Sequence, residues 1–204
     1  MLISVEGVDG SCGTTICDFI QKFLEERMLT VIRLKEPEQP YRDILLHDKH
    51  TSPREEVFAF MASRARLYEQ VVIPSLEKGK FVLCDRSIDS TIAYQAFASG
   101  YIGPNLCNIF NLYAINGRKP DLTILLDLDP QIACRRKPYG DDNFEKRGFD
   151  FMNKVRYAYG GLATKEPERI KMIDASLNIE KVKSRVKGLL ESMLRAKGKE
   201  NEGL

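Results

Sequence analysis

A glycine-rich turn near the start of the chain has the residue types of a phosphate-binding loop. The apolar segment Leu2–Val5 is followed by a turn that leads into a stretch of helical pattern. Small residues between a strand and a helix let successive backbone N–H groups point at phosphate oxygens, as in the pattern G-x-x-x-x-G-K-[ST]. The candidate phosphate-binding residues are Gly7, Val8, Asp9, Gly10, Ser11, Cys12, Gly13, Thr14 and Thr15.

Two positions of this turn depart from the pattern. Cys12 stands where the pattern has its second glycine, and Gly13 stands where it has lysine. Gly13 keeps a backbone N–H group but supplies no ammonium. The Cβ atom of Cys12 narrows the loop and strains any left-handed backbone conformation there. Taken alone, the turn is also compatible with a glycine-rich entry to a helix that binds no phosphate.

A second candidate site follows the apolar segment Phe81–Cys84. Asp85 comes directly after this segment. A carboxylate in that position, beside a phosphate loop, organises Mg²⁺ together with a hydroxyl such as that of Thr14. Arg86 is next, and its guanidinium can hold a phosphoryl group through two parallel N–H groups. The alternative is an ordinary ion pair at the end of a strand.

Apolar runs of strand length alternate with longer helical patterns, which indicates βαβ units and a parallel sheet in an α/β protein. The expected strands are Leu2–Val5, Val31–Leu34, Phe81–Cys84, Leu122–Leu126 and Ile170–Ile173. The expected helices are Thr14–Arg27, Arg54–Lys78 with a kink at Pro74, Ser90–Ser99, Asn105–Asn116, Pro130–Arg136, Phe149–Thr164 and Ile179–Ala196. Ligands bind outside the carboxyl ends of the strands in such a sheet, and both candidate sites fall there.

The chain has 204 residues, of which 43% are apolar and 29% charged, and its formal net charge is +2. We therefore expect one globular domain over residues 1–204, with a short lid at about 137–147 and a polar tail at 195–204 that frays. Interleaved charges of both signs argue against nucleic acid or a membrane as a partner. Five cysteines without a C-x-x-C pair favour a reducing, cytoplasmic location over a disulfide scaffold or a zinc site.

Six segments along the chain form a recognisable series. They are EGVDGS at Glu6–Ser11, Glu36-Pro37, the pair Phe60 and Arg64, DRSIDSTIAYQ at Asp85–Gln95, KPDLTILLDLDP at Lys119–Pro130 and KEPERIKMIDA at Lys165–Ala175. In this order and at this spacing they resemble the bacterial and archaeal thymidylate kinases. The resemblance implies a P-loop kinase fold: a three-layer sandwich on a five-stranded parallel sheet, with a short lid. It also implies a homodimer that uses ATP and Mg²⁺ to phosphorylate dTMP to dTDP.

The resemblance further implies roles for individual residues. Phe60 would stack on the thymine ring, Arg64 would hydrogen-bond a base carbonyl, and Tyr94 would lie beneath the deoxyribose. Asp9 would hold the sugar 3′-hydroxyl, and Arg86 would bind the acceptor phosphate. The set implied for dTMP is Asp9, Glu36, Pro37, Phe60, Arg64, Arg86, Ser90, Thr91 and Tyr94, and the set implied for Mg²⁺ is Thr14 and Asp85.

Several residues that differ from the family's pattern stand at positions that would take part in phosphoryl transfer. Besides the change at Gly13, Asn143 stands where the family's lid has an arginine, and Ser87 follows Arg86 in place of an aromatic residue. Phosphoryl transfer depends on positioned cations, so the loss of one costs on the order of 10²–10³ in rate. The cations that can replace it are Arg135, Arg136, Lys137, Lys146 and Arg147 in or beside the lid, and Lys35 after the second strand.

Three functions are therefore open. The first is an active dTMP kinase with relocated cations, for which the catalytic candidates are Asp9, Arg86, Arg135 and Arg136 and the lid candidates are Lys137, Asn143, Lys146 and Arg147. The second is a catalytically impaired homologue that still binds a nucleotide. The third is a phosphotransferase with a different acceptor, because EPEQP at Glu36–Pro40 changes the wall of the acceptor site.

Overall fold

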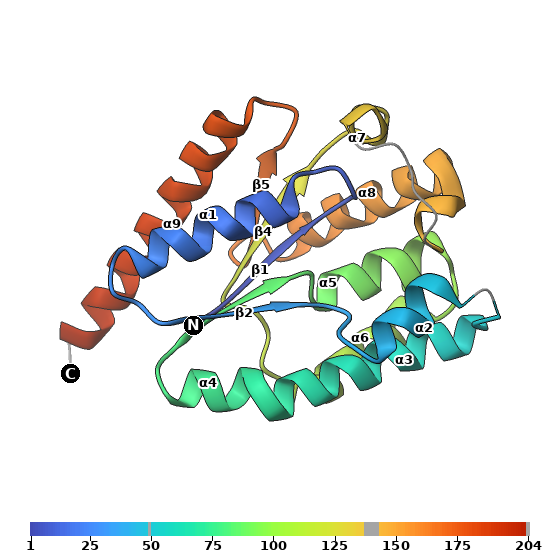
Figure 1. Ribbon diagram of the computed structural model, residues 1–204, viewed down its shortest axis with the longest axis horizontal. Coiled ribbons are helices and arrows are strands. Elements are labelled where there is room, and N and C mark those ends of the chain that lie inside the picture. Colours follow the sequence, from blue (N-terminus) through green and yellow to red (C-terminus); the bar gives the residue numbers. More distant parts are fainter. Residues whose placement is uncertain (49, 137–142, 203–204) are drawn as a thin grey trace.

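Five parallel strands form the central sheet of the computed structural model, which describes residues 1–48, 50–136 and 143–202 (Figure 1). The strands are β1 (Leu2–Gly7), β2 (Val31–Lys35), β3 (Phe81–Asp85), β4 (Leu122–Asp127) and β5 (Ile170–Asp174). Their order across the sheet is β2-β3-β1-β4-β5, and every neighbouring pair is parallel. The predicted fold is confirmed, and each strand continues one or two residues past its predicted end.

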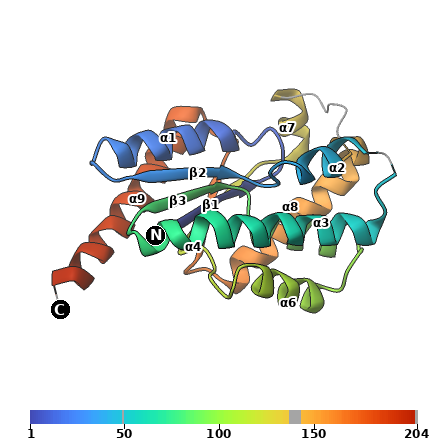
Figure 2. The ribbon, with the colours of Figure 1, turned by 60° about the horizontal axis from the view of Figure 1, so that its bottom comes forward.

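Helices cover both faces of the sheet and give the molecule three layers (Figure 2). One face carries α1 (Gly13–Glu25) and α9 (Ile179–Glu202), which also contact each other. The other face carries α4 (Ile73–Glu77), α5 (Ile88–Thr91) and α8 (Gly148–Lys165), while α3 (Pro53–Leu67) and α6 (Pro104–Ala114) pack beside them. The central strands β1, β3 and β4 are covered on both sides and bury almost every side chain, which is why their sequences are nearly continuous apolar runs. The edge strands β2 and β5 are less buried.

The long helix predicted between the second and third strands is divided by a π-helical turn. α3 ends at Leu67, the turn η1 occupies Tyr68–Val72, and α4 follows. The backbone N–H of Ile73 donates to the carbonyl of Tyr68, five residues back, immediately before Pro74. Proline has no backbone donor and disrupts the regular bonding pattern around it. The predicted distortion at Pro74 therefore takes the form of a wider turn just before the proline.

Several element boundaries differ from the prediction. The helix expected at Ser90–Ser99 begins earlier, as α5, and continues as a second π-helical segment, η2 (Ile92–Ala98). A helix that the sequence did not suggest, α2 (Tyr41–His47), starts directly after Pro40. α9 continues as a helix to Glu202, whereas the prediction ended it at Ala196 and let the tail fray.

The segments around the carboxyl ends of the strands are short. α7 (Pro130–Arg136) follows β4, and a 3-10 turn, η3 (Glu145–Arg147), precedes α8. The predicted lid spans residues 137–147; its part 137–142 lies outside the described residues, and the part 143–147 packs over α2 and α3. Figure 1 shows the turn after β1, α2 and α7 gathered at this end of the molecule.

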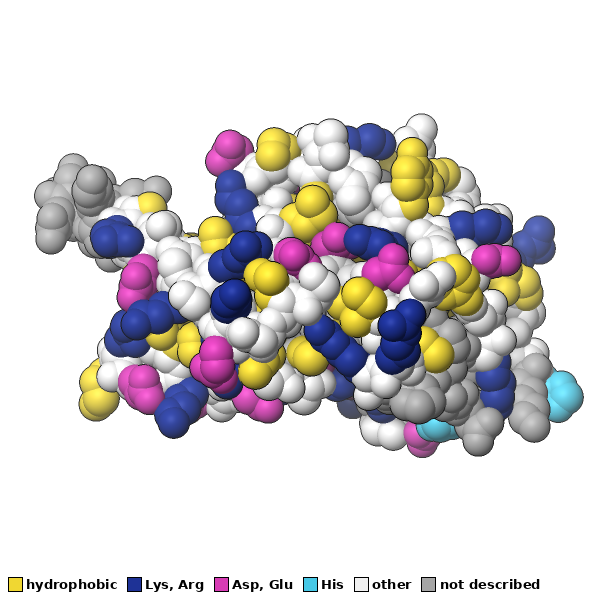
Figure 3. Space-filling model, turned by 90° about the horizontal axis from the view of Figure 1, so that it is seen from above, with side chains coloured by type: hydrophobic (Ala, Val, Ile, Leu, Met, Phe, Trp, Pro, Cys, Tyr) yellow, Lys and Arg dark blue, Asp and Glu magenta, His cyan; other side chains and the backbone are white. Residues whose placement is uncertain are grey.

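The surface seen from above carries no block of one charge. Figure 3 shows basic, acidic and hydrophobic side chains interspersed over this face. Such mixing is what the near balance of 31 basic and 29 acidic residues predicts. Over the part of the chain that the structure describes, none of the helices has the length and apolar character that crossing a membrane requires.

Candidate active site

The turn after β1 contains two glycines at points where the backbone passes close to a neighbour. At Gly7 a Cβ atom would come 2.7 Å from the carbonyl oxygen of Leu126 in β4. At Gly10, where φ is 84°, it would come 2.7 Å from the carbonyl oxygen of Ala133 in α7. Any larger residue at Gly7 would push the turn away from β4, and one at Gly10 would push it away from α7. These glycines are required by close packing.

The turn encloses a cavity suited to an anion. Its volume is about 320 Å³, and it is lined by residues 5–15 together with Lys35, Asp85, Arg86 and Arg136. All nine predicted phosphate-binding residues are among them. α1 starts at Gly13 on the cavity wall, and the first N–H groups of a helix have no acceptor within the helix. A helix N-terminus and three cations at one cavity favour a bound polyphosphate.

Cys12 has the strained backbone that the sequence predicts. Its φ is 68° and its ψ is 27°, a left-handed conformation that costs a residue with a Cβ atom roughly 1–2 kcal/mol. Its thiol lies 3.9 Å from the carbonyl oxygen of Gly10 and makes at most a weak contact there. The turn thus holds the cysteine in a conformation that favours glycine.

Replacing Cys12 by glycine should raise the free energy of unfolding by about 0.5–1 kcal/mol. The relief of left-handed strain exceeds the roughly 0.5–1 kcal/mol that glycine loses in backbone entropy. Urea-induced unfolding measures the change. Gly10→Ala is the control and should destabilise the protein, since its Cβ atom has no space. A lower stability for Cys12→Gly would contradict the assigned strain.

Oxygen ligands for a divalent cation lie together beside the loop. Thr14 Oγ1 donates a hydrogen bond to Asp85 Oδ2 at 3.3 Å, and Asp85 is buried at the end of β3. Mg²⁺ takes hydroxyl and carboxylate oxygens and completes its shell with water and substrate phosphates. The sequence predicted that these two residues, 71 positions apart, would hold Mg²⁺ together. Their hydroxyl and carboxylate oxygens are ligands of the kind that this ion prefers.

A second cavity, of about 160 Å³, adjoins the first. Its lining consists of Asp9, Lys35, Glu36, Pro37, Arg42, Leu46, Phe60, Arg86, Ser90, Tyr94, Gln95 and Phe144. Arg86 is fixed in it by hydrogen bonds to Asp9 (2.8 Å), Ser90 (3.3 Å) and the Tyr94 hydroxyl (3.4 Å). The structure brings together seven of the nine residues predicted for the acceptor nucleotide. Arg64 and Thr91 do not line it.

One end of the second cavity is aromatic. The ring of Phe144 lies 5.9 Å from that of Phe60 and 5.9 Å, edge-on, from that of Tyr94. Sequence reasoning considered its neighbour Asn143 and missed Phe144. The rings are inclined to one another, at 59° and 82°, so they offer a planar ligand both stacked and edge-on contacts. The polar end, around Arg86, and the aromatic end match the two ends of a nucleotide.

Arg64 is buried behind this cavity and is fully engaged with the protein. Its Nε donates to Glu36 Oε2 at 2.8 Å, Nη1 donates to the side chains of Thr91 and Asn111, and Nη2 donates to the Ser87 carbonyl. All three guanidinium nitrogens therefore contact protein oxygens. These contacts give Arg64 a supporting place, and the contact with the base that the resemblance implies stays a prediction.

Glu36 connects this buried arginine to the cavity. Its Oε2 pairs with Arg64, whereas Oε1 is buried without a hydrogen-bond partner in the described structure. Burial raises the pKa of Glu36, and the neighbouring Arg64 opposes that rise. A buried carboxylate oxygen without a partner costs free energy, so a ligand that donates a hydrogen bond to it gains affinity.

The predicted lid cations divide into separate groups. Arg136 lines the first cavity, the one enclosed by the turn after β1, and donates to the carbonyls of Ala175 (2.7 Å) and Ser176 (3.1 Å). Arg147 instead pairs with Glu56 (2.5 Å) and lines neither cavity, and Arg135 is exposed and lines neither. Lys146 lines neither cavity, and Lys137 lies outside the described residues.

Asn143 holds the lid on α2. Its backbone N–H donates to the carbonyl of Leu46 at 3.0 Å, and its Nδ2 donates to the carbonyls of Leu45 (3.2 Å) and Asp48 (2.9 Å). These bonds satisfy carbonyl groups at the end of a helix, which have no partner within it. Asn143 therefore anchors Phe144 in the second cavity and supplies no cation to the first.

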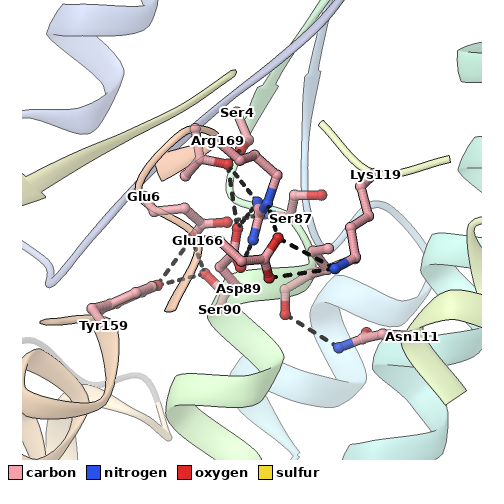
Figure 4. Close-up of polar contacts among 12 residues, drawn as sticks. Ser4, Glu6, Ser87, Asp89, Ser90, Asn111, Lys119, Tyr159, Glu166 and Arg169 are labelled. Atoms are coloured by element: carbon pink, nitrogen blue, oxygen red, sulfur yellow. Dashed lines mark hydrogen bonds and ion pairs between the residues drawn. The ribbon is translucent and has the colours of Figure 1, made fainter. Parts of the chain in front are cut away.

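A buried polar network, drawn in Figure 4, includes Glu6 of the first cavity and Ser90 of the second. Glu6 accepts hydrogen bonds from the Ser87 backbone (2.7 Å), from Ser90 (2.6 Å) and from the Tyr159 hydroxyl (2.9 Å). In the same network, Asp89 is paired with Arg169 through two bonds, of 2.7 and 2.8 Å. Burial, with a smaller effect of the Asp89 charge, raises the pKa of Glu6 to about 8. Sequence reasoning missed this network, because its members come from β1, α5 and α8 and from the segments before α5 and β5.

Glu6→Gln should flatten the pH dependence of stability between pH 5 and pH 8. The folded chain holds the Glu6 proton up to about pH 8, whereas the unfolded chain releases it near 4.5. The native protein therefore loses up to about 1.4 kcal/mol per pH unit as the pH rises through this window. Glutamine keeps an acceptor for Ser87 and donates to the two hydroxyls. Urea unfolding at pH 5.5, 7.0 and 8.5 measures the difference, and a constant difference between the two proteins would contradict the assignment.

The chain is similar over nearly its whole length to known proteins of one family. The family model described as thymidylate kinase matches residues 5–186. The thymidylate kinase of Thermosipho melanesiensis is 40% identical over 200 residues, covering 95% of this chain and 99% of that protein. The thymidylate kinase of Clostridium novyi is 38% identical over 200 residues, covering 93% and 97%.

The similarity extends to three dimensions. The crystal structure of thymidylate kinase from Ehrlichia chaffeensis superposes with a TM-score of 0.78 at 29% identity, covering 94% of this chain and 98% of that one. Agreement of sequence and fold over almost the complete length leaves no large region unaccounted for. This chain belongs to the thymidylate kinase family of nucleoside monophosphate kinases.

Proposed function

We propose that this protein transfers the γ-phosphoryl group of ATP to dTMP, giving ADP and dTDP, without the lysine usual in its phosphate loop. The observation that carries the proposal is the common wall of the two cavities. Asp9, Lys35 and Arg86 line both of them. A donor polyphosphate in the first cavity and an acceptor phosphate in the second would therefore meet at these three side chains.

The acceptor end of the reaction depends on Arg86. Its guanidinium is held by Asp9, Ser90 and Tyr94, so it can grip a phosphate without first losing rotamer freedom. An oxygen of that phosphate forms the new bond to the γ-phosphorus, and the bond from the γ-phosphorus to the β–γ bridging oxygen breaks, leaving ADP. N–H groups of the turn hold the donor phosphates in line for this exchange.

Mg²⁺ would be held by the Thr14 hydroxyl and the Asp85 carboxylate. When bound, it would neutralise charge on the donor phosphates. Asp85 also forms an ion pair with Lys35 at 3.1 Å, so both Thr14 and Lys35 fix the position of its carboxylate. The residues thus orient the polyphosphate tail against the common wall.

Recognition of the base would fall to the aromatic end of the second cavity. Phe60 and Phe144 offer faces to a planar ring, and Tyr94 lies between that end and Arg86. Glu36 Oε1 is a free acceptor on the wall, and the N–H group of a thymine ring is a donor that can satisfy it. This supports a thymine or uracil acceptor over cytosine, whose ring nitrogen at that position is an acceptor.

The test is ADP release in a coupled assay with ATP, Mg²⁺ and each of dTMP, dUMP, dCMP and dGMP. We expect dTMP to be preferred over the whole panel. Preference for another monophosphate would favour the phosphotransferase with a different acceptor. Tight binding of dTMP without ADP release would instead favour an impaired nucleotide-binding homologue, the reading that Gly13 and Cys12 support.

A homodimer is part of the proposal. Large apolar side chains are exposed along α3 and α6, two helices that pack against each other: Phe58 (57%), Leu106 (47%), Ile109 (59%) and Tyr113 (89%). The rings of Phe58 and Phe110 contact each other at 5.8 Å and link the two helices into one apolar face. Contiguous exposed apolar surface of this kind is typical of protein interfaces.

Ile109→Glu should convert the dimer to a monomer, because it buries a charge in the centre of that apolar face. Sedimentation velocity measures the change in mass. Met172→Glu is the matched control: Met172 is equally exposed, at 58%, but lies on β5 away from α6. The proposed interface fails if Ile109→Glu stays dimeric, or if the wild type is already a monomer.

The proposed compartment is the cytoplasm. All five cysteines are free thiols. Burial raises the pKa of Cys17 to about 12 and that of Cys107 to about 11, so both are protonated at neutral pH and poorly reactive. This agrees with a protein that functions in a reducing environment.

A further inference from the structure

We propose that Lys35 supplies the cation that Gly13 lacks, so that one side chain serves the donor phosphates in place of the loop lysine. This inference rests on the proposed function and names the residue that provides the charge missing from the loop. Lys35 is the last residue of β2, and its backbone lies opposite Asp85 in the parallel pairing of β2 with β3. Its ammonium therefore reaches the end of β3 from the side opposite the loop.

The first argument concerns the carboxylate that both positions share. The Nζ of Lys35 lies 3.1 Å from Asp85 Oδ2. A Cβ atom built on Gly13 would lie 3.7 Å from Asp85 Oδ1, an ordinary contact, so a side chain at position 13 would start beside the same group. The side chain of Lys35 thus ends at the carboxylate beside which a side chain at position 13 would begin. A positive charge is present there, and it comes from β2.

The second argument concerns reach. Lys35 lines the first cavity, which we call the phosphate cavity, and also the second, which we call the acceptor cavity. Its side chain is half exposed, so the ammonium can turn from Asp85 to a phosphate oxygen while remaining hydrated. An ammonium is a point charge on a flexible stem, which suits a phosphoryl group that moves between two sites.

The third argument concerns the other cations at the phosphate cavity. Arg86 is held toward the acceptor by Asp9, Ser90 and Tyr94. Arg136 donates from both terminal nitrogens to the carbonyl oxygens of Ala175 and Ser176 after β5, so its guanidinium is already engaged with the protein. Among the described residues that line this cavity, Lys35 is thus the cation paired with Asp85, the carboxylate beside Gly13.

In the transfer step, Lys35 acts through charge alone. The acceptor oxygen bonds to the γ-phosphorus while the bridging oxygen leaves with the electron pair of the broken bond. Lys35 neither gains nor loses a proton, and it stabilises the negative charge on the transferred group and on the leaving oxygen. Its contribution is therefore larger in the transition state than in the bound ground state.

The experiment compares four proteins: wild type, Lys35→Ala, Lys187→Ala, and Lys35→Ala combined with Gly13→Lys. Lys187 is the matched control, because it is similarly exposed and also pairs with a carboxylate, that of Glu191. The kcat for dTMP phosphorylation should fall about 10²-fold in Lys35→Ala and stay at the wild-type value in Lys187→Ala, with the melting temperature unchanged in both. Gly13→Lys in that background should restore kcat at least tenfold.

Binding of ATP, measured by calorimetry with and without Mg²⁺, gives a readout independent of turnover. Lys35→Ala should weaken ATP binding severalfold in both conditions, while Lys187→Ala leaves it unchanged. The inference is overturned if Lys35→Ala matches Lys187→Ala in both kcat and ATP affinity, or if Gly13→Lys restores neither. If the wild type makes no dTDP, the proposed function fails, and the ATP affinities alone then decide the role of Lys35.

Discussion

Arg86→Ala should lower kcat/KM for dTMP by on the order of 10²–10³, the largest activity loss that we expect from any single substitution. Arg86 is fixed on the common wall of the two cavities by Asp9, Ser90 and Tyr94, so its charge is already in place when the acceptor phosphate arrives. Removing a preorganised cation costs this much because nothing else of the same charge can move in without reorganisation. Steady-state kinetics at saturating ATP measure the effect.

Two further variants sharpen this prediction. Arg86→Lys keeps the charge but loses the two parallel N–H groups, so we expect an intermediate loss. Arg185→Ala removes an exposed arginine from α9 and should leave the kinetics unchanged. If Arg86→Ala retained more than about a tenth of the wild-type value, Arg86 would not be the ligand of the acceptor phosphate.

Arg64→Met should lower the free energy of unfolding by about 3–5 kcal/mol, the largest stability loss that we expect. Arg64 is 1% exposed, and Glu36, with which it pairs, is 4% exposed. Removing one partner of a buried ion pair leaves the other charge uncompensated in an apolar environment. In a protein of this size the loss corresponds to a decrease of about 6–20 °C in melting temperature. Thermal and urea unfolding measure it.

The double variant Arg64→Met with Glu36→Gln separates the supporting role from a direct contact with the base. Glutamine removes the stranded charge, so the double variant should recover a large part of the lost stability. If Arg64 instead served mainly to bind dTMP, Arg64→Met would retain its stability and lose dTMP affinity. The contacts of all three guanidinium nitrogens with protein oxygens favour the first outcome.

The sequence predicts the sheet well, because buried parallel strands are continuous apolar runs and need no long-range information. It also predicts that Cys12 lies in a strained loop and that Thr14 and Asp85 meet, because both follow from motifs at strand ends. The π-helical turns before Pro74 and after Thr91 were not predicted in detail, since they come from packing as well as from local propensity. α2 begins directly after a proline in a segment that reads as a loop.

The parts of the site that the sequence does not predict depend on contacts between distant residues. Arg64 faces Glu36 and not the cavity because Thr91 and Asn111, 27 and 47 positions later, accept its other hydrogen bonds. Glu6 belongs to a known motif, but its raised pKa follows from burial among side chains of other elements. Phe144 enters the acceptor cavity because Asn143 is bound to α2. None of these arrangements has a local pattern.

The central claim, phosphoryl transfer to dTMP by a loop without its lysine, is tested most directly in a single turnover. Excess protein is mixed with Mg²⁺, dTMP and ATP labelled at the γ-phosphate, and the labelled products are separated over time. The label should pass to dTDP, nearly one for each ATP bound, and should stay in ATP when dTMP is omitted. Label that stays in ATP, or is released as inorganic phosphate while dTMP is bound, would contradict the account.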